Sequence, residues 1–176
     1  LEVSPLLADD PGGTIDAAKR IWALVDRPNL LVKVPATPAG IPAVTELIAR
    51  GINLNVTLIF SPVTYREVAL AYIEGIRRRT ESGASVSRIA SVASVFVSRV
   101  DSVIDEELLA RADAEPQLTA YLGQSAVANA KIIYQAYSDI FSGAQFHELR
   151  RAGARPQRPL WASTATKNPK YSDLKY

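Results

Sequence analysis

One lysine lies inside an otherwise apolar segment. Lys33 is part of the run 30–35 (LLVKVP), whose branched apolar residues are typical of a buried strand. Lysine is rarely buried unless it is paired or has a chemical task. An amine in a dry interior can lose its proton and attack a carbonyl carbon. The alternative is an edge-strand lysine that discourages aggregation. The run alone favours this alternative, so the neighbouring segments decide the question.

Polar side chains recur at alternate positions of four predicted strands. Because strand residues alternate between the two faces of a sheet, Asn55 and Thr57 share one face, and Val56 and Leu58 share the other. The same alternation pairs Glu2 with Ser4, Leu31 with Lys33, and Ser94 with Phe96. A dry core gains nothing from these polar groups, whereas catalysis at the carboxyl ends of barrel strands uses them. Glu2 beside Lys33 fits a structural ion pair and an acid/base role about equally.

The composition is that of an ordinary globular protein and excludes several function classes. The chain has 176 residues, 48% hydrophobic and 22% charged, enough for one domain with a core. A net charge of +2 is too small to predict nucleic-acid or anionic-membrane binding. With no cysteine and one histidine, disulfides, thiolate metal sites and multi-histidine metal sites are excluded. The sequence shows no membrane span or secretory signal, so we expect a cytoplasmic protein.

Strands and helices are expected to alternate along the chain. The predicted strands are 1–4, 30–35, 55–60, 89–97 and 159–163, and the predicted helices are 14–26, 40–50, 61–80, 101–111, 125–141 and 145–151. This order predicts a parallel sheet with helical crossovers. The step from Glu2 to Lys33 is 31 residues, from Lys33 to Thr57 it is 24, and from Thr57 to Ser94 it is 37. An eight-unit barrel has ~31 residues per unit. We therefore expect a single α/β domain over 1–176, an incomplete (β/α)8 TIM barrel.

Five segments resemble transaldolases. Residues 29–37, followed by Gly40-Ile41, resemble the strand that carries the family's Schiff-base lysine. Residues 51–61 are similar to the next strand, including its spacing from the lysine. Residues 1–4, 94–99 and 161–169 are similar to three further family segments. The resemblance spans essentially the whole chain, and the lysine and Asn-x-Thr segments together are highly specific.

The resemblance implies a (β/α)8 barrel and a class I aldol mechanism in the pentose phosphate pathway, without a cofactor or metal. A dihydroxyacetone unit would pass from a ketose phosphate, such as sedoheptulose 7-phosphate or fructose 6-phosphate, to an aldose phosphate. The resemblance places Lys33 as the nucleophile and Glu2 as the carboxylate that moves protons through a water. It places Thr57 as the residue that orders this water. The implied partners are sugar phosphates, not nucleic acid or a membrane.

The resemblance also assigns the substrate-binding residues. Asn55 and Ser94 would hold substrate hydroxyls, Phe96 would form a wall of the pocket, and Arg99 and Ser163 would bind phosphate.

Three departures from the family pattern are visible. Val95 replaces a proline and Ser98 replaces a glycine. Lys167 stands two residues beyond the position of a second phosphate arginine in shorter members, so it is either a phosphate ligand or a solvated loop lysine. The five predicted strands match the third to seventh of the barrel. The aspartate that the family's first strand contributes to bond cleavage has no counterpart here.

Two alternative functions stay open. One is a fructose 6-phosphate aldolase-like lyase, although the 69-residue step from Ser94 to Ser163 implies inserted helices that favour transaldolase. The other is an inactive fragment, because Leu1 begins as the interior of a strand and both ends look truncated. Five strands leave two open edges. We therefore expect the chain to be stable only as a homo-oligomer or when associated with the missing barrel segments.

Overall fold

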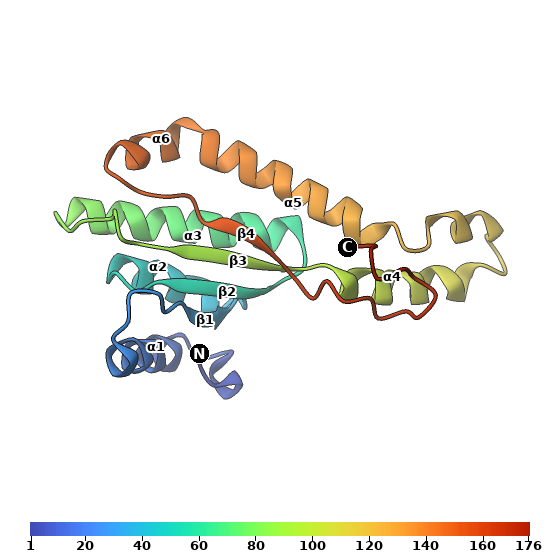
Figure 1. Ribbon diagram of the computed structural model, residues 1–176, viewed down its shortest axis with the longest axis horizontal. Coiled ribbons are helices and arrows are strands. Elements are labelled where there is room, and N and C mark those ends of the chain that lie inside the picture. The colour runs from blue at the N-terminus through green and yellow to red at the C-terminus, as the bar shows by residue number, and fades with distance from the viewer.

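A four-stranded parallel sheet organises the chain. The computed structural model describes residues 1–176 (Figure 1). The strands are β1 (Val32–Pro35), β2 (Leu54–Ile59), β3 (Ser91–Phe96) and β4 (Arg158–Ala162), and they lie side by side in sequence order. All three strand pairs are parallel. The predicted α/β class is confirmed, and the sheet is consistent with part of a (β/α)8 barrel.

Helices connect the strands. They are η1 (Pro5–Leu7), α1 (Pro11–Val25), α2 (Gly40–Ala49), α3 (Pro62–Glu81), α4 (Ser98–Arg111), η2 (Pro116–Tyr121), α5 (Ser125–Ser142) and α6 (Ala144–Arg151). Figure 1 shows α4 and η2 extending beyond the strand ends, with the C-terminal segment running along α4. The inserted helices predicted between Ser94 and Ser163 are therefore α4, α5 and α6, together with the short η2. No helix is long and apolar enough to cross a membrane.

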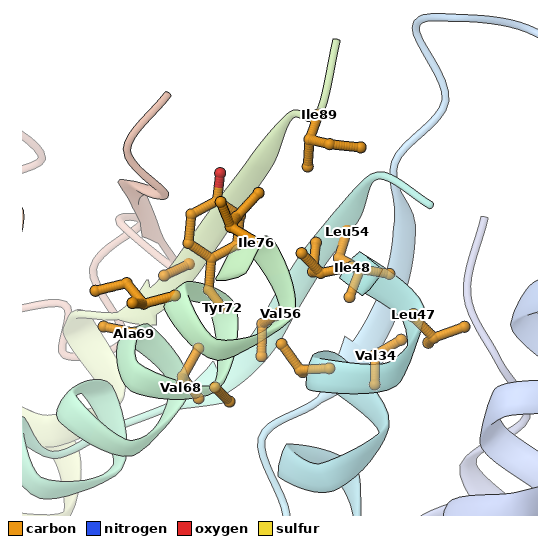
Figure 2. Close-up of a cluster of buried hydrophobic side chains, with 14 of the residues drawn as sticks. Val34, Leu47, Ile48, Leu54, Val56, Val68, Ala69, Tyr72, Ile76 and Ile89 are labelled. Atoms are coloured by element: carbon orange, nitrogen blue, oxygen red, sulfur yellow. The ribbon is translucent and has the colours of Figure 1, made fainter. Parts of the chain in front are cut away.

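The core lies between the sheet and the helices α2 and α3. Figure 2 shows side chains of β1 and β2, such as Val34 and Val56, directed toward these helices. Leu47 of α2 and Tyr72 of α3 are completely buried against them. Alternate strand residues fill this layer, so the residues between them belong to the opposite face. That opposite face carries the chemistry predicted from the sequence.

The predicted first strand is reduced to one bridge. Glu2 pairs in parallel with Lys33, and no longer ladder forms. Ser4 leaves the sheet because its hydroxyl accepts a hydrogen bond from the Leu6 N–H at 3.3 Å and caps η1. Pro5 follows immediately and has no N–H to donate to a ladder. The prediction of a five-stranded sheet was therefore wrong by one strand. Glu2 nevertheless forms a parallel bridge with Lys33.

The alternation also fails near the end of β2. Val56 is aligned with Ala93, but Ile59 is aligned with Val95, so β2 has one residue more than β3 across this interval. Leu58 takes the extra position with φ of 64° and is 44% exposed. The prediction that Leu58 shares the face of Val56 was wrong, because a bulge reverses the faces of the residues that follow it.

Two helices begin earlier than predicted. Helix α1 begins at Pro11 because the Asp10 carboxylate accepts the Gly13 N–H at 2.9 Å, a cap that the sequence reading assigned to Thr14. Helix α4 begins at Ser98 and not at Asp101. This start places Arg99 in the first turn of α4.

Candidate functional site

A row of polar residues crosses the open face of the sheet. Glu2 is bridged to Lys33, and Lys33 is aligned with Asn55 of β2. The Lys33 N–H donates to Leu1 O at 2.9 Å, and Lys33 O accepts from the Val3 N–H at 3.2 Å. These backbone bonds fix the register, so neighbouring side chains of the row emerge on the same face.

The lysine and the glutamate of this row form an ion pair. Lys33 Nζ lies 3.3 Å from Glu2 Oε2. The two side chains are 39% and 64% exposed, respectively. Lys33 is therefore half-buried and not in a dry interior in this chain, whose sheet has four strands and does not close. At 3.3 Å the carboxylate contacts the amine directly, which places it within reach of protons at this site.

A small pocket surrounds this pair. It has a volume of about 180 Å³, and its lining includes Glu2, Lys33, Thr57, Leu58 and Phe96. Thr57 is 7% exposed, and its Oγ1 is buried without a hydrogen-bond partner in the protein. A buried hydroxyl is seldom left unpaired. The structure therefore brings together the amine, the carboxylate and an unsatisfied hydroxyl in one pocket.

Asn55 and Ser94 lie next to each other on the same face. The Ser94 hydroxyl donates to Asn55 Oδ1 at 2.7 Å, and Ser94 is 3% exposed. This bond orients the amide of Asn55 so that its NH₂ group stays available as a donor. The two residues do not line the 180 Å³ pocket, but Asn55 is the strand neighbour of Lys33.

Aromatic rings border the site at the end of β3. The rings of Phe96 and Phe60 meet edge to face, with centroids 5.1 Å apart. The guanidinium carbon of Arg99 lies 5.4 Å from the centroid of the Phe96 ring. Stacking on a ring restrains an otherwise flexible guanidinium. Arg99 is thus held beside the pocket wall with its donors accessible.

The remaining predicted phosphate residues lie where β4 ends and α4 begins. Ser163 follows β4 with φ of 54°, and its carbonyl accepts the Ser98 N–H at 2.9 Å. The two hydroxyl oxygens are 3.3 Å apart. Lys167 lines a different pocket, of about 370 Å³, which Ser98 shares. Lys167 therefore does not line the Lys33 pocket. Ser98 lines the pocket of Lys167 and also contacts Ser163.

The sequence reading missed two residues of this region. Leu58 lines the pocket only because of the bulge, which no local pattern announced. Ser98 was noted merely as a tolerated replacement for glycine, yet it is 1% exposed and contacts Ser163. The position of Ser98 just before Arg99, at the end of a predicted strand, was the available signal.

The fold and this site together define a parallel α/β protein with a lysine–carboxylate pair on one face of its sheet. The Transaldolase/Fructose-6-phosphate aldolase family matches residues 1–176. The chain belongs to this family.

Curated relatives agree with the family match. The chain is 52% identical over 177 residues to a transaldolase of Mycolicibacterium paratuberculosis, a match that covers 100% of this chain and 47% of that protein. It is 52% identical over 176 residues to a transaldolase of Thiobacillus denitrificans, covering 100% and 48%. It is 51% identical to transaldolase 1 of Streptomyces avermitilis, covering 100% and 46%. The chain thus spans about half the length of the curated relatives that it matches.

Proposed function

We propose that this chain carries the Schiff-base half of a transaldolase site. In this proposal, Lys33 attacks the C2 carbonyl of a ketose phosphate, and loss of water from the carbinolamine leaves an iminium ion. The iminium accepts the electron pair of the C3–C4 bond when that bond breaks, and the C4 hydroxyl gives its proton to the aspartate of the family's first strand, which this chain does not contain. An aldose phosphate then leaves, and a dihydroxyacetone enamine stays on Lys33. The enamine attacks the aldehyde carbon of an acceptor aldose phosphate, and hydrolysis of the new iminium frees the lysine.

One observation carries the proposal more than any other. Lys33 Nζ is 3.3 Å from the Glu2 carboxylate, and both side chains line one pocket with the unpartnered Thr57 hydroxyl. Formation and breakdown of a carbinolamine each require proton transfers to and from oxygen and nitrogen. In the proposal, Glu2 supplies these transfers through a water that Thr57 holds. A purely structural ion pair has no use for an unsatisfied hydroxyl beside it.

The phosphate end of the substrate is assigned to the start of α4. Arg99 is exposed on the first turn, where backbone N–H groups and the positive end of the helix dipole favour an anion. Ser163 lies beside Ser98 at the same place. Asn55 and Ser94, which share a hydrogen bond, are proposed to hold the substrate hydroxyls between the lysine and the phosphate.

The test is a transfer assay on the protein that contains this chain. With fructose 6-phosphate and erythrose 4-phosphate, a transaldolase forms sedoheptulose 7-phosphate, and omission of the acceptor stops turnover. A lyase instead releases glyceraldehyde 3-phosphate and dihydroxyacetone without any acceptor. The inserted helices α4–α6 between β3 and β4 support the transferase. Turnover that survives Lys33→Arg would refute both the transferase and the lyase proposal, because each depends on Lys33 as the nucleophile.

The open face of the sheet supports a second part of the proposal. Phe60 and Leu160 are each 40% exposed, and Leu58 is 44% exposed. Apolar side chains gathered near a parallel sheet edge favour association. We therefore propose that this face is covered in the working cytoplasmic enzyme, by further barrel segments or by a second copy. Sedimentation of the 176-residue chain tests this, because a stable monomer with a fully exposed face would contradict it.

A further inference from the structure

Two carboxylates on helix α4 lie outside the site described above. Asp101 and Asp105 are one helical turn apart, and they are 1% and 6% exposed. Aspartate is almost never this buried unless its charge is paired or hydrogen-bonded. Their contacts show what they hold in place.

Both carboxylates join the same two parts of the chain to α4. Asp105 accepts the Gly123 N–H at 2.7 Å and the Tyr171 hydroxyl at 2.6 Å. Asp101 accepts the Ala126 N–H at 2.7 Å and the Tyr176 hydroxyl at 2.6 Å. With one oxygen, Asp105 binds the turn before α5 and Asp101 binds the first turn of α5. With the other oxygen, each binds the segment that follows β4. We call the segment 164–176 the C-terminal strap.

Lys175 completes the contact between the strap and the turn. Its Nζ lies 3.5 Å from Asp101 Oδ2 and 3.7 Å from the centroid of the Tyr171 ring, and it donates to Gly123 O. Gly123 has φ of 69°, and a Cβ there would collide with Lys175 and with the Tyr171 ring. Glycine therefore suits this position, because it adopts the positive φ without strain and leaves room for the strap.

The strap carries Lys167, to which the family resemblance assigns a phosphate contact. It follows Ser163, whose carbonyl is tied to the Ser98 N–H, and it brings Lys167 to the 370 Å³ pocket that Ser98 and both aspartates line. Lys167 makes no side-chain hydrogen bond or ion pair of its own, so its position depends on the contacts that hold the rest of the strap. Those contacts converge on Asp101 and Asp105.

We propose that Asp101 and Asp105 are positioning residues, which hold the strap against α4 and thereby keep Lys167 and Ser163 at the phosphate end of the site. The second half of this statement rests on the proposed function. The carboxylates do not contact the substrate themselves. Their oxygens are occupied by hydroxyl and N–H donors, and the Lys175 ammonium offsets the charge of Asp101.

We call the contacts of Asp101 and Asp105 with the strap the clamp. The hydrogen bond from Tyr171 to Asp105 gives the clamp a defined pH range. Hydrogen bonding to Asp105 raises the pKa of Tyr171 to about 12, from the ordinary value of 10.0. The folded state thus favours the neutral phenol. The contribution of this bond is present below pH 10 and is lost as the pH rises through about 12.

Limited trypsin digestion tests the clamp without any activity. Cleavage after Lys167 and Lys170 should occur when the strap detaches from α4. When the strap rebinds faster than trypsin cuts, the cleavage rate follows the fraction of molecules with a detached strap. We expect Asp105→Asn and the milder Tyr171→Phe to speed this cleavage at least about tenfold, as the loss of a hydrogen bond to a charged group implies. Glu107→Gln is the matched control, because Glu107 is an exposed acid on the same helix. Unchanged cleavage in both variants would overturn the clamp.

Ketose trapping tests the link to phosphate binding. Borohydride reduction measures the concentration of ketose that half-saturates Schiff-base formation on Lys33. With fructose 6-phosphate this concentration should rise about tenfold in Asp105→Asn, whereas with dihydroxyacetone, which has no phosphate, it should not change. Equal changes for both ketoses, or none, would overturn the positioning role. If the unmodified protein traps neither ketose, the proposed function is wrong and the role in phosphate binding falls with it. The digestion result would still decide whether the aspartates hold the strap.

Discussion

Replacement of Glu2 by glutamine separates a catalytic carboxylate from a structural ion pair. At 3.3 Å in water the Coulomb attraction of the Lys33–Glu2 pair is about 1 kcal/mol. The side chains are 39% and 64% exposed, so screening and side-chain entropy reduce the net contribution to ~0.2–1 kcal/mol. Glu2→Gln should therefore lower the free energy of unfolding by less than ~1 kcal/mol. If Glu2 moves protons for Lys33, the same change should slow iminium formation by ~10²–10⁴-fold.

Two measurements on the same variant decide between these roles. Urea unfolding gives the stability change, and the rate of borohydride-trapped adduct at saturating fructose 6-phosphate gives the rate of iminium formation. Glu2→Asp is the matched control, since it keeps the charge and shortens the reach. A variant that traps fructose 6-phosphate at the unmodified rate would refute the acid/base role of Glu2. A stability loss of several kcal/mol would show that the pair has a structural role that its exposure does not explain.

Three further substitutions test the packing and the phosphate assignment. Tyr72→Phe should lower the free energy of unfolding by ~1–3 kcal/mol in urea, because the buried Tyr72 hydroxyl donates to Arg155 O at 2.6 Å and the carbonyl would lose its partner. Gly75→Ala should cost ~1–3 kcal/mol by the same measurement, because a Cβ there would lie 2.7 Å from Ile48 Cβ where α3 crosses α2. Arg99→Ala should raise the KM for fructose 6-phosphate about tenfold or more with little change in kcat, since it removes a charge-assisted phosphate contact.

Each substitution has a control on the same chain. Tyr134→Phe changes a side chain that is 55% exposed and should leave stability unchanged. Gly12→Ala adds a Cβ whose nearest neighbour is 3.5 Å away, so it should not destabilise the protein. Arg66→Ala removes an exposed arginine of α3 and should leave KM unchanged. Effects of equal size in test and control would contradict the corresponding assignment.

The sequence predicted the row of polar residues because its physical basis is local. Alternation along a strand places Lys33 opposite the core-facing Val34, and the parallel order of short strands aligns Lys33 with Asn55. The same reasoning failed at Leu58, since a bulge depends on how two strands match and not on either sequence alone. It also overestimated the first strand, where the Ser4 cap and Pro5 redirect the chain.

The sequence could not predict the contacts of Asp101 and Asp105 with the strap, because they depend on residues far away in the chain. Asp101 and Asp105 have helical spacing, which alone describes a solvated face. Their partners Tyr171 and Tyr176 lie 66 and 75 residues away in sequence. Only the tertiary fold brings these hydroxyls to the carboxylates.

The most direct test of the central claim is the site of the trapped adduct. The protein is incubated with fructose 6-phosphate, reduced with borohydride and digested, and the peptides are identified by mass spectrometry. The account predicts a reduced ketose-derived adduct on Lys33, and none in Lys33→Arg. An adduct on Lys131 or Lys167 in place of Lys33, or no adduct on any lysine, would contradict the assignment of Lys33 as the nucleophile.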